Sequence, residues 1–163
     1  MGYLLGEKLR HLRAQYQLTQ MDVAQRLQLE SHSHIAKLET GKTTPSLGFV
    51  LRVATLFGVS TDYLLRDTIP IKASSTVTLI GRAPANIPVY RFGKYLRALR
   101  LQRGINQTQL ARQLAISRTY LNNMEAGRKA PSPVLIVVIA DFFQVTTDAL
   151  LFNVDSSRPA GID

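Results

Sequence analysis

The histidines at positions 32 and 34 are the first side chains in this sequence whose type and spacing could do chemistry. The chain has three histidines, and His11 is the third. Two histidines that bind one metal ion from a helix stand three or four residues apart, because that spacing places them on one face. His32 and His34 are two residues apart, and no cysteine is present to complete a site. We therefore expect no metal and no other cofactor. A pH switch stays open, because histidine titrates near neutrality.

Carboxylates are the other candidates for catalysis, and they are scattered along the chain. A glycine-rich phosphate loop is absent, and so is a nucleophile with a matching base. The sequence therefore favours a binding protein over an enzyme. The carboxylates in question are Asp22, Glu30, Asp62, Asp141 and Asp148.

The charge of the chain favours a polyanionic partner. The 20 Lys and Arg exceed the 11 Asp and Glu, which gives a net charge of +9 and a pI near 10.3. Nucleic acid, an acidic membrane surface and a merely solvated basic surface all fit this charge. No apolar run approaches the ~20 residues that span a bilayer, and the first residues lack the apolar core of a signal peptide. We expect a globular, cytoplasmic protein without a membrane partner.

The sequence contains an internal repeat, and this repeat indicates the domain organisation of the chain. GEKLRHLRAQYQLTQMDVAQRL (6–27) matches GKYLRALRLQRGINQTQLARQL (93–114) at an offset of 87 residues. From IAKLETGKTTPS (35–46), which matches LNNMEAGRKAPS (121–132), the offset is 86. The first copy therefore holds one extra residue, which we place in the turn around Leu29 and Glu30.

The repeat divides the chain into two small domains. We expect a first domain at 1–66, a linker at 67–88, a second domain at 89–154 and a tail at 155–163. The linker holds three prolines and little helical periodicity. Its STVTLI segment favours β structure, so a short strand and an extended tether are both open, and we favour the tether.

Capping residues mark helix starts inside each copy. Thr19 to Asp22 has the form of a capping box, and Asn106 to Gln109 is its amide counterpart. A third helix is predicted at 31–39 and at 117–125, with Ser31 and Ser117 as N-caps. The glycines that follow, Gly41 and Gly127, are expected to end it in the left-handed conformation.

A fourth and a fifth helix complete the prediction for each copy. Pro45-Ser46 and Pro131-Ser132 open the fourth, and Ser60 or Thr146 caps the fifth. On propensity alone VLIVVI (134–139) would be a strand. Its counterpart in the first copy has a helical apolar pattern, so we predict a helix here too, with extra apolar surface that could serve dimerisation.

The order of these motifs resembles the helix-turn-helix of the Xre-like family, the five-helix repressors of the Cro type. The resemblance covers both copies, about four fifths of the chain. It rests on LTQ (18–20) and INQ (105–107), on IAKLETG (35–41) and LNNMEAG (121–127), and on VSTDYLL (59–65) and VTTDALL (145–151). It implies an all-α chain of two lambda-repressor-like domains in tandem.

The resemblance also implies which residues contact DNA. In this family the third helix enters the major groove, where Arg can donate two hydrogen bonds to guanine and Asn can pair with adenine. The first copy has His32, Ser33 and Lys37 at positions where the second has Arg118, Thr119 and Asn123. Because the first set offers less bidentate geometry, we expect weaker base contacts from it. The full predicted DNA-binding set is Gln20, Ser31, His32, Ser33, Lys37, Lys42, Gln107, Ser117, Arg118, Thr119, Tyr120, Asn122, Asn123, Arg128 and Lys129.

Two further pairs, Arg13 with Glu39 and Arg100 with Glu125, are placed like the family's ion pair between the first and third helices. We expect them to be structural. For His32, contact with a base or phosphate and a plain solvated side chain stay open. His34 corresponds to Tyr120 and is expected at the helix edge or on the sugar-phosphate backbone.

The function that the resemblance implies is sequence-specific binding of double-stranded DNA by a transcriptional regulator. We favour a repressor, because binding alone can occlude a promoter. The two copies could act as a covalent pseudo-dimer, and a homodimer or a protein antagonist is compatible with the sequence. The alternative is an antitoxin-like or accessory module in which one copy binds a protein or serves dimerisation, and the weaker base contacts expected from the first copy favour that copy for the role.

Overall fold

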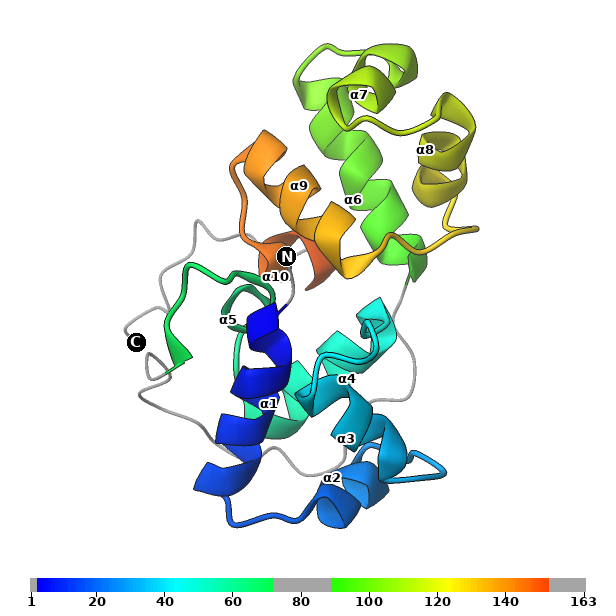
Figure 1. The fold of residues 1–163 in the computed structure, drawn as a ribbon. Coiled ribbons are helices and arrows are strands. Elements are labelled where there is room, and N and C mark those ends of the chain that lie inside the picture. Colours follow the sequence, from blue (N-terminus) through cyan, green and yellow to red (C-terminus); the bar gives the residue numbers. More distant parts are fainter. Residues whose placement is uncertain (1–2, 72–88, 153–163) are drawn as a thin grey trace, which may run out of the picture. The chain divides into compact units, whose positions relative to one another are not determined.

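The computed structural model describes residues 3–71 and 89–152, which form two compact units, Met1–Ile87 and Pro88–Asp163 (Figure 1). All regular structure within the described ranges is helical, which confirms the prediction of an all-α chain. The STVTLI segment and the tail lie outside the described residues.

Within its described residues, each unit contains the five helices that the repeat predicts. In the first unit they are α1 (Tyr3–Gln15), α2 (Gln20–Arg26), α3 (Ser33–Glu39), α4 (Leu47–Phe57) and α5 (Thr61–Leu65). In the second unit they are α6 (Val89–Gln102), α7 (Gln107–Gln113), α8 (Arg118–Glu125), α9 (Pro133–Phe143) and α10 (Thr147–Phe152).

Side chains cap the second helix of each unit as predicted. The Thr19 hydroxyl accepts a hydrogen bond from the Asp22 N–H, and the Asp22 carboxylate accepts one from the Thr19 N–H at 2.7 Å. Asn106 and Gln109 form the equivalent pair in α7. Both capping boxes satisfy backbone N–H groups that a helix start leaves unpaired.

The start of α3 is the element that the sequence predicts wrongly. Ser31 does not cap it: the helix begins at Ser33, its N-cap is His32, and the His32 side chain accepts no capping hydrogen bond. The Ser31 hydroxyl instead accepts from the Ser33 N–H at 3.1 Å, a shorter turn that competes with capping. In the second unit Ser117 caps α8 as predicted and accepts from the Tyr120 N–H.

The cause is a single inserted residue. Leu29 and Ile116 hold the same place after the second helix, since their N–H groups donate to the carbonyls of Ala24 and Ala111 at 2.9 and 3.0 Å. Ser117 follows Ile116 at once, whereas Glu30 separates Leu29 from Ser31. The predicted extra residue is therefore Glu30, and it shifts the cap out of place.

The fourth helix contributes residues to the core of each unit. In the first unit α4 buries eight of its eleven residues, and most of these belong to one core cluster with the buried leucines of α1. VLIVVI lies within α9, so the helix prediction is confirmed: Ile136 and Ile139 are buried, while Val134 and Val138 are 45% and 41% exposed. Burial among helices overrides the strand propensity of these residues.

The first and third helices of each unit approach closely at a glycine. A Cβ atom on Gly6 would overlap the carbonyl oxygen of Leu38, and one on Gly93 would overlap that of Met124. This approach brings α1 against α3 and α6 against α8, and so fixes where the third helix lies on its unit.

Candidate nucleic-acid interface

The second unit presents a capped third helix with exposed polar residues in its first turn. In the turn after α7, Ala115 has a left-handed backbone conformation. Ser117 then caps α8. Arg118, Thr119 and Asn122 are exposed, whereas Leu121 is buried and anchors the helix to the core. An exposed Arg, Thr and Asn on one short helix can donate to and accept from base edges.

A buried ion pair joins this helix to α6. Arg100 donates from Nε and Nη2 to the two carboxylate oxygens of Glu125, at 2.6 and 3.0 Å, and from Nη1 to the Ile105 carbonyl. The two side chains are 8% and 3% exposed. This hydrogen bonding raises the pKa of Arg100 above its ordinary value.

The first unit has the same pair in a more open setting. Arg13 donates to Glu39 at 2.7 and 3.1 Å, and the side chains are 18% and 5% exposed. In both units the residue that opens the second helix joins the network: Gln20 donates to Glu39, and Gln107 to Glu125, each at 2.9 Å. Gln107 also reaches Asn122 at 3.4 Å. These glutamines therefore brace the third helix.

The third helix of the first unit presents different chemistry. His32, Ser33 and Lys37 are exposed, and Glu30 adds an exposed carboxylate in the turn before them. His34 packs edge to face on Phe49, with ring centroids 5.5 Å apart, so it lies at the helix edge, one of the two places expected for it.

The loop after α8 carries the predicted basic residues Arg128 and Lys129, both exposed. The Arg128 Nε donates to the Asn123 side chain at 3.1 Å, and the Lys129 Nζ lies 5.4 Å from the centre of the Tyr120 ring. In the first unit Lys42 follows α3, and its N–H donates to the Lys37 carbonyl at 2.8 Å.

One buried charge escaped the sequence analysis. Lys8 is fully buried in the first unit, where its Nζ donates to the carbonyls of Tyr63 and Arg66 at 2.5 and 2.7 Å. Burial lowers the pKa of Lys8. The residue that corresponds to Lys8 in the second copy is Tyr95, so the repeat does not point to a buried lysine. The hydrogen-bond partners of Lys8 also lie more than fifty residues further along the chain.

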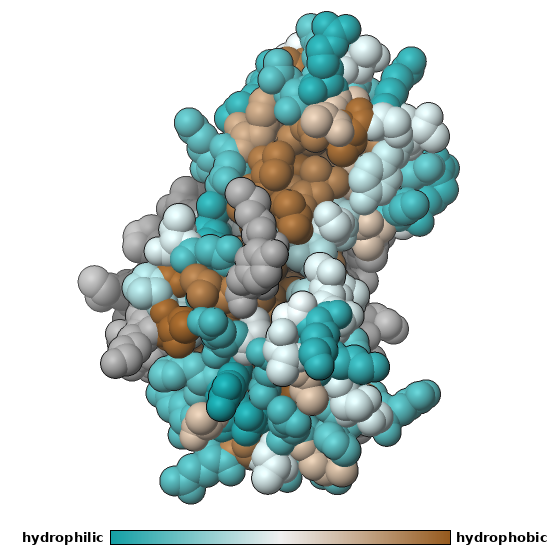
Figure 2. Space-filling model, in the orientation of Figure 1, coloured by the Kyte–Doolittle hydropathy of each residue, from teal (hydrophilic) through white to brown (hydrophobic). Residues whose placement is uncertain are grey.

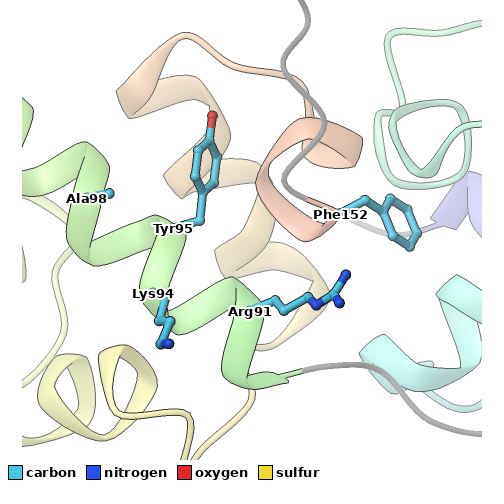
Figure 3. A pocket seen from close by; sticks show the side chains of 5 residues that line it. All are labelled: Arg91, Lys94, Tyr95, Ala98 and Phe152. Carbon is cyan, nitrogen blue, oxygen red and sulfur yellow. The ribbon is translucent and has the colours of Figure 1, made fainter.

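A cavity of about 410 Å³ lies beside this counterpart in the second unit (Figure 3). It is lined by two basic and two aromatic side chains and one alanine, and it is separate from α7 and α8. The lining residues are Arg91, Lys94, Tyr95, Ala98 and Phe152.

The second unit also exposes an apolar surface on α9. Figure 2 shows apolar side chains gathered on the face of this unit where α9 lies. Val134 and Val138 stand one turn apart there, at the positions of Gly48 and Arg52 in the first unit. No helix within the described ranges is long and apolar enough to cross a membrane.

Comparison with known proteins assigns both units to one kind of domain. A family model described as a helix-turn-helix domain matches residues 4–66, and a second helix-turn-helix model matches residues 96–150. Together the two matches account for both copies of the repeat.

One curated relative is the HTH-type transcriptional activator BcrR of Enterococcus faecalis. It is 40% identical over 60 residues, which are 37% of this chain and 29% of that protein, so the chain matches less than a third of the relative's length. Among solved structures, the restriction-modification controller protein C.AhdI from Aeromonas hydrophila is 31% identical. That match covers 38% of this chain and 94% of the controller chain, with a TM-score of 0.36.

Proposed function

Because the chain carries two tandem helix-turn-helix domains of the Xre-like, Cro type, we propose that it is a sequence-specific DNA-binding transcriptional regulator of the cytoplasm. The observation that carries the proposal is α8, which is capped at Ser117 and presents Arg118, Thr119 and Asn122 to solvent. Such a helix fits the major groove with its N-terminal side chains toward the bases. We propose no catalytic activity and no cofactor.

The second domain makes the main contribution to base contact in this proposal. Residues 89–154 hold 9 basic and 3 acidic side chains, a net +6, whereas residues 1–66 hold 8 and 5, a net +3. The exposed Glu30 also repels phosphate beside α3, whose start has no side-chain cap. The second domain therefore supplies most of the phosphate attraction and of the salt dependence.

The first domain supports a second candidate role. Its altered α3 favours a partner other than DNA bases, so the alternative function is an antitoxin-like or accessory module in which this domain binds a protein. Val134 and Val138 on α9 support a homodimer through the second domain. Repression by occlusion needs DNA binding alone, and a protein antagonist that prevents this binding would relieve it.

Selection from random duplexes, followed by footprinting, tests the proposal. We expect one enriched motif and a footprint of one or two half-sites. Arg118→Ala should weaken binding to the selected duplex about 5- to 150-fold, because it removes the preference at one base pair. This is the range for one good bidentate contact. The matched variant His32→Ala should change affinity less than threefold if the first domain makes no base contact. Failure to enrich any motif at moderate salt would refute sequence-specific regulation.

A further inference from the structure

The loop that follows α8 is tied back to that helix through Asn123. The Asn123 carbonyl accepts from the backbone N–H groups of Arg128 and Lys129 at 2.9 and 3.2 Å. Its side-chain Oδ1 accepts from the Arg128 Nε at 3.1 Å. One residue thus holds both the loop backbone and the side chain of the first basic residue.

A second tie fixes the next basic residue. The Tyr120 hydroxyl donates to the Ala130 carbonyl at 3.3 Å, which lays its ring along the loop. The Lys129 Nζ lies over that ring, 5.4 Å from its centre. Contacts as exposed as these add little to stability, but they restrict two long side chains that would otherwise sample many rotamers.

The first unit shares the backbone tie, because the Lys42 N–H donates to the Lys37 carbonyl at 2.8 Å, but its described residues show no equivalent side-chain ties. Lys37 replaces Asn123 and Lys42 replaces Arg128, and two lysines cannot accept from each other. His34 replaces Tyr120 and packs on Phe49 instead. The side-chain ties are therefore a property of the second copy, whereas the backbone tie belongs to the repeat.

The bond from Arg128 also bears on what Asn123 can do. A bidentate contact with adenine needs the Asn amide plane to align with the base, with Oδ1 accepting and Nδ2 donating. Arg128 already occupies one lone pair of Oδ1 and sets that plane. Asn123 is half-buried, while its neighbour Asn122 is exposed, so Asn122 is the better placed amide for a base.

We propose that Asn123 and Tyr120 are positioning residues, which hold Arg128 and Lys129 in place to grip DNA phosphates, and that Asn123 does not contact bases. This inference rests on the proposed function as a DNA-binding regulator. Ordering the two cations before binding removes part of the entropy that a flexible loop would lose on DNA. Phosphate contacts set register and orientation, so the tied loop would fix how α8 enters the groove.

Double-mutant binding measurements test the proposal. Asn123→Ala, Arg128→Ala and the double variant are titrated against the selected duplex and a scrambled duplex between 50 and 200 mM salt. We expect each single variant to weaken binding to both duplexes by a similar factor and to lower the salt slope by about 1. The double variant should bind as the weaker single variant does, because both changes remove one contact.

Two controls make the result specific. Asn122→Ala should weaken only the selected duplex and leave the salt slope unchanged. An unchanged midpoint of thermal unfolding for Asn123→Ala shows that the loss is not a folding defect. Two outcomes would overturn the role of Asn123 while DNA binding stands. One is additive losses of affinity in the double variant. The other is that Asn123→Ala loses its preference at one base pair while its salt slope is unchanged. Absence of DNA binding by the unaltered chain would overturn both proposals.

Discussion

Replacing Glu125 by alanine is expected to unfold the second domain while the first stays folded. The Glu125 carboxylate accepts two hydrogen bonds from Arg100 and one from Gln107. The substitution leaves the Arg100 guanidinium without a counterion in a site where that side chain is 8% exposed. Its Nη1 keeps the bond to the Ile105 carbonyl, so the charge stays in place and unpaired.

The magnitude follows from this burial. Removing one partner of a buried ion pair costs about 3 to 5 kcal/mol, because the remaining charge is neither paired nor hydrated. A domain of some 66 residues is stable by roughly 3 to 10 kcal/mol. The loss is therefore comparable with the whole stability of the domain. Glu39→Ala is the matched control, and its loss should be smaller because Arg13 is 18% exposed and reaches water more easily.

Hydrogen exchange resolved by peptide separates the two domains in one experiment. In Glu125→Ala, amides of α6 to α8 should exchange at least a hundredfold faster, the factor that corresponds to about 3 kcal/mol, while those of α1 to α3 keep their rates. Glu125→Gln preserves the shape and one acceptor and should lose less. If the amides of α6 to α8 exchange at unchanged rates in Glu125→Ala, the Arg100–Glu125 pair does not stabilise the domain, and this assignment is refuted.

Three further predictions concern single positions. Gly93→Ala should lower the thermal stability of the second domain by more than 2 kcal/mol, since its Cβ meets backbone at the end of α8; a loss no larger than that of an exposed helix residue would show that α6 can move away. The Thr19 hydrogen bonds hold the pKa of Asp22 below its ordinary 3.8, so the capping box stabilises the first domain above that pH and loses its contribution as pH falls through the lower folded value. Asp22→Asn should flatten this part of the acid dependence in urea titrations, and equal slopes for the two proteins would contradict it. Deleting Glu30 should let Ser31 cap α3 as Ser117 caps α8, which helical backbone chemical shifts at His32 would report; an unchanged start at Ser33 would show that the insertion is not the cause.

The repeat made most of the fold predictable, because two copies constrain each assignment twice. VLIVVI would be a strand on propensity, and the register against the first copy gave the helix that α9 forms. The start of α3 failed because Ser31 has the right residue type at the wrong place, and capping depends on backbone geometry after an insertion. Gly6 and Gly93 recur at the same offset, and such a recurrence is a usable sequence signal for a close approach of two helices.

Contacts between exposed side chains could not be predicted in the same way. The family resemblance placed Asn123 among the base contacts and Arg128 in a loop near phosphate, which assigns a role to each residue separately. Their hydrogen bond depends on the turn at Gly127, where a φ of 69° brings the loop back onto α8. Residue types determine which hydrogen-bond partners are possible, and the local backbone conformation determines which of these bonds form.

The two copies share the interactions that hold the third helix on its domain, and they differ at the surface around that helix. Both keep the glycine contact, the capping box and the Arg–Glu–Gln network, so the third helix is held on its domain by the same interactions twice. They differ in the turn before that helix, in the exposed side chains of the helix itself and in the loop after it. In the proposed complex a DNA groove would meet these surface segments and not the network, so the copies can diverge in what they bind without loss of fold. Substitutions that exchange the turn, the exposed side chains of the third helix and the loop between copies should therefore exchange binding while leaving this shared network intact.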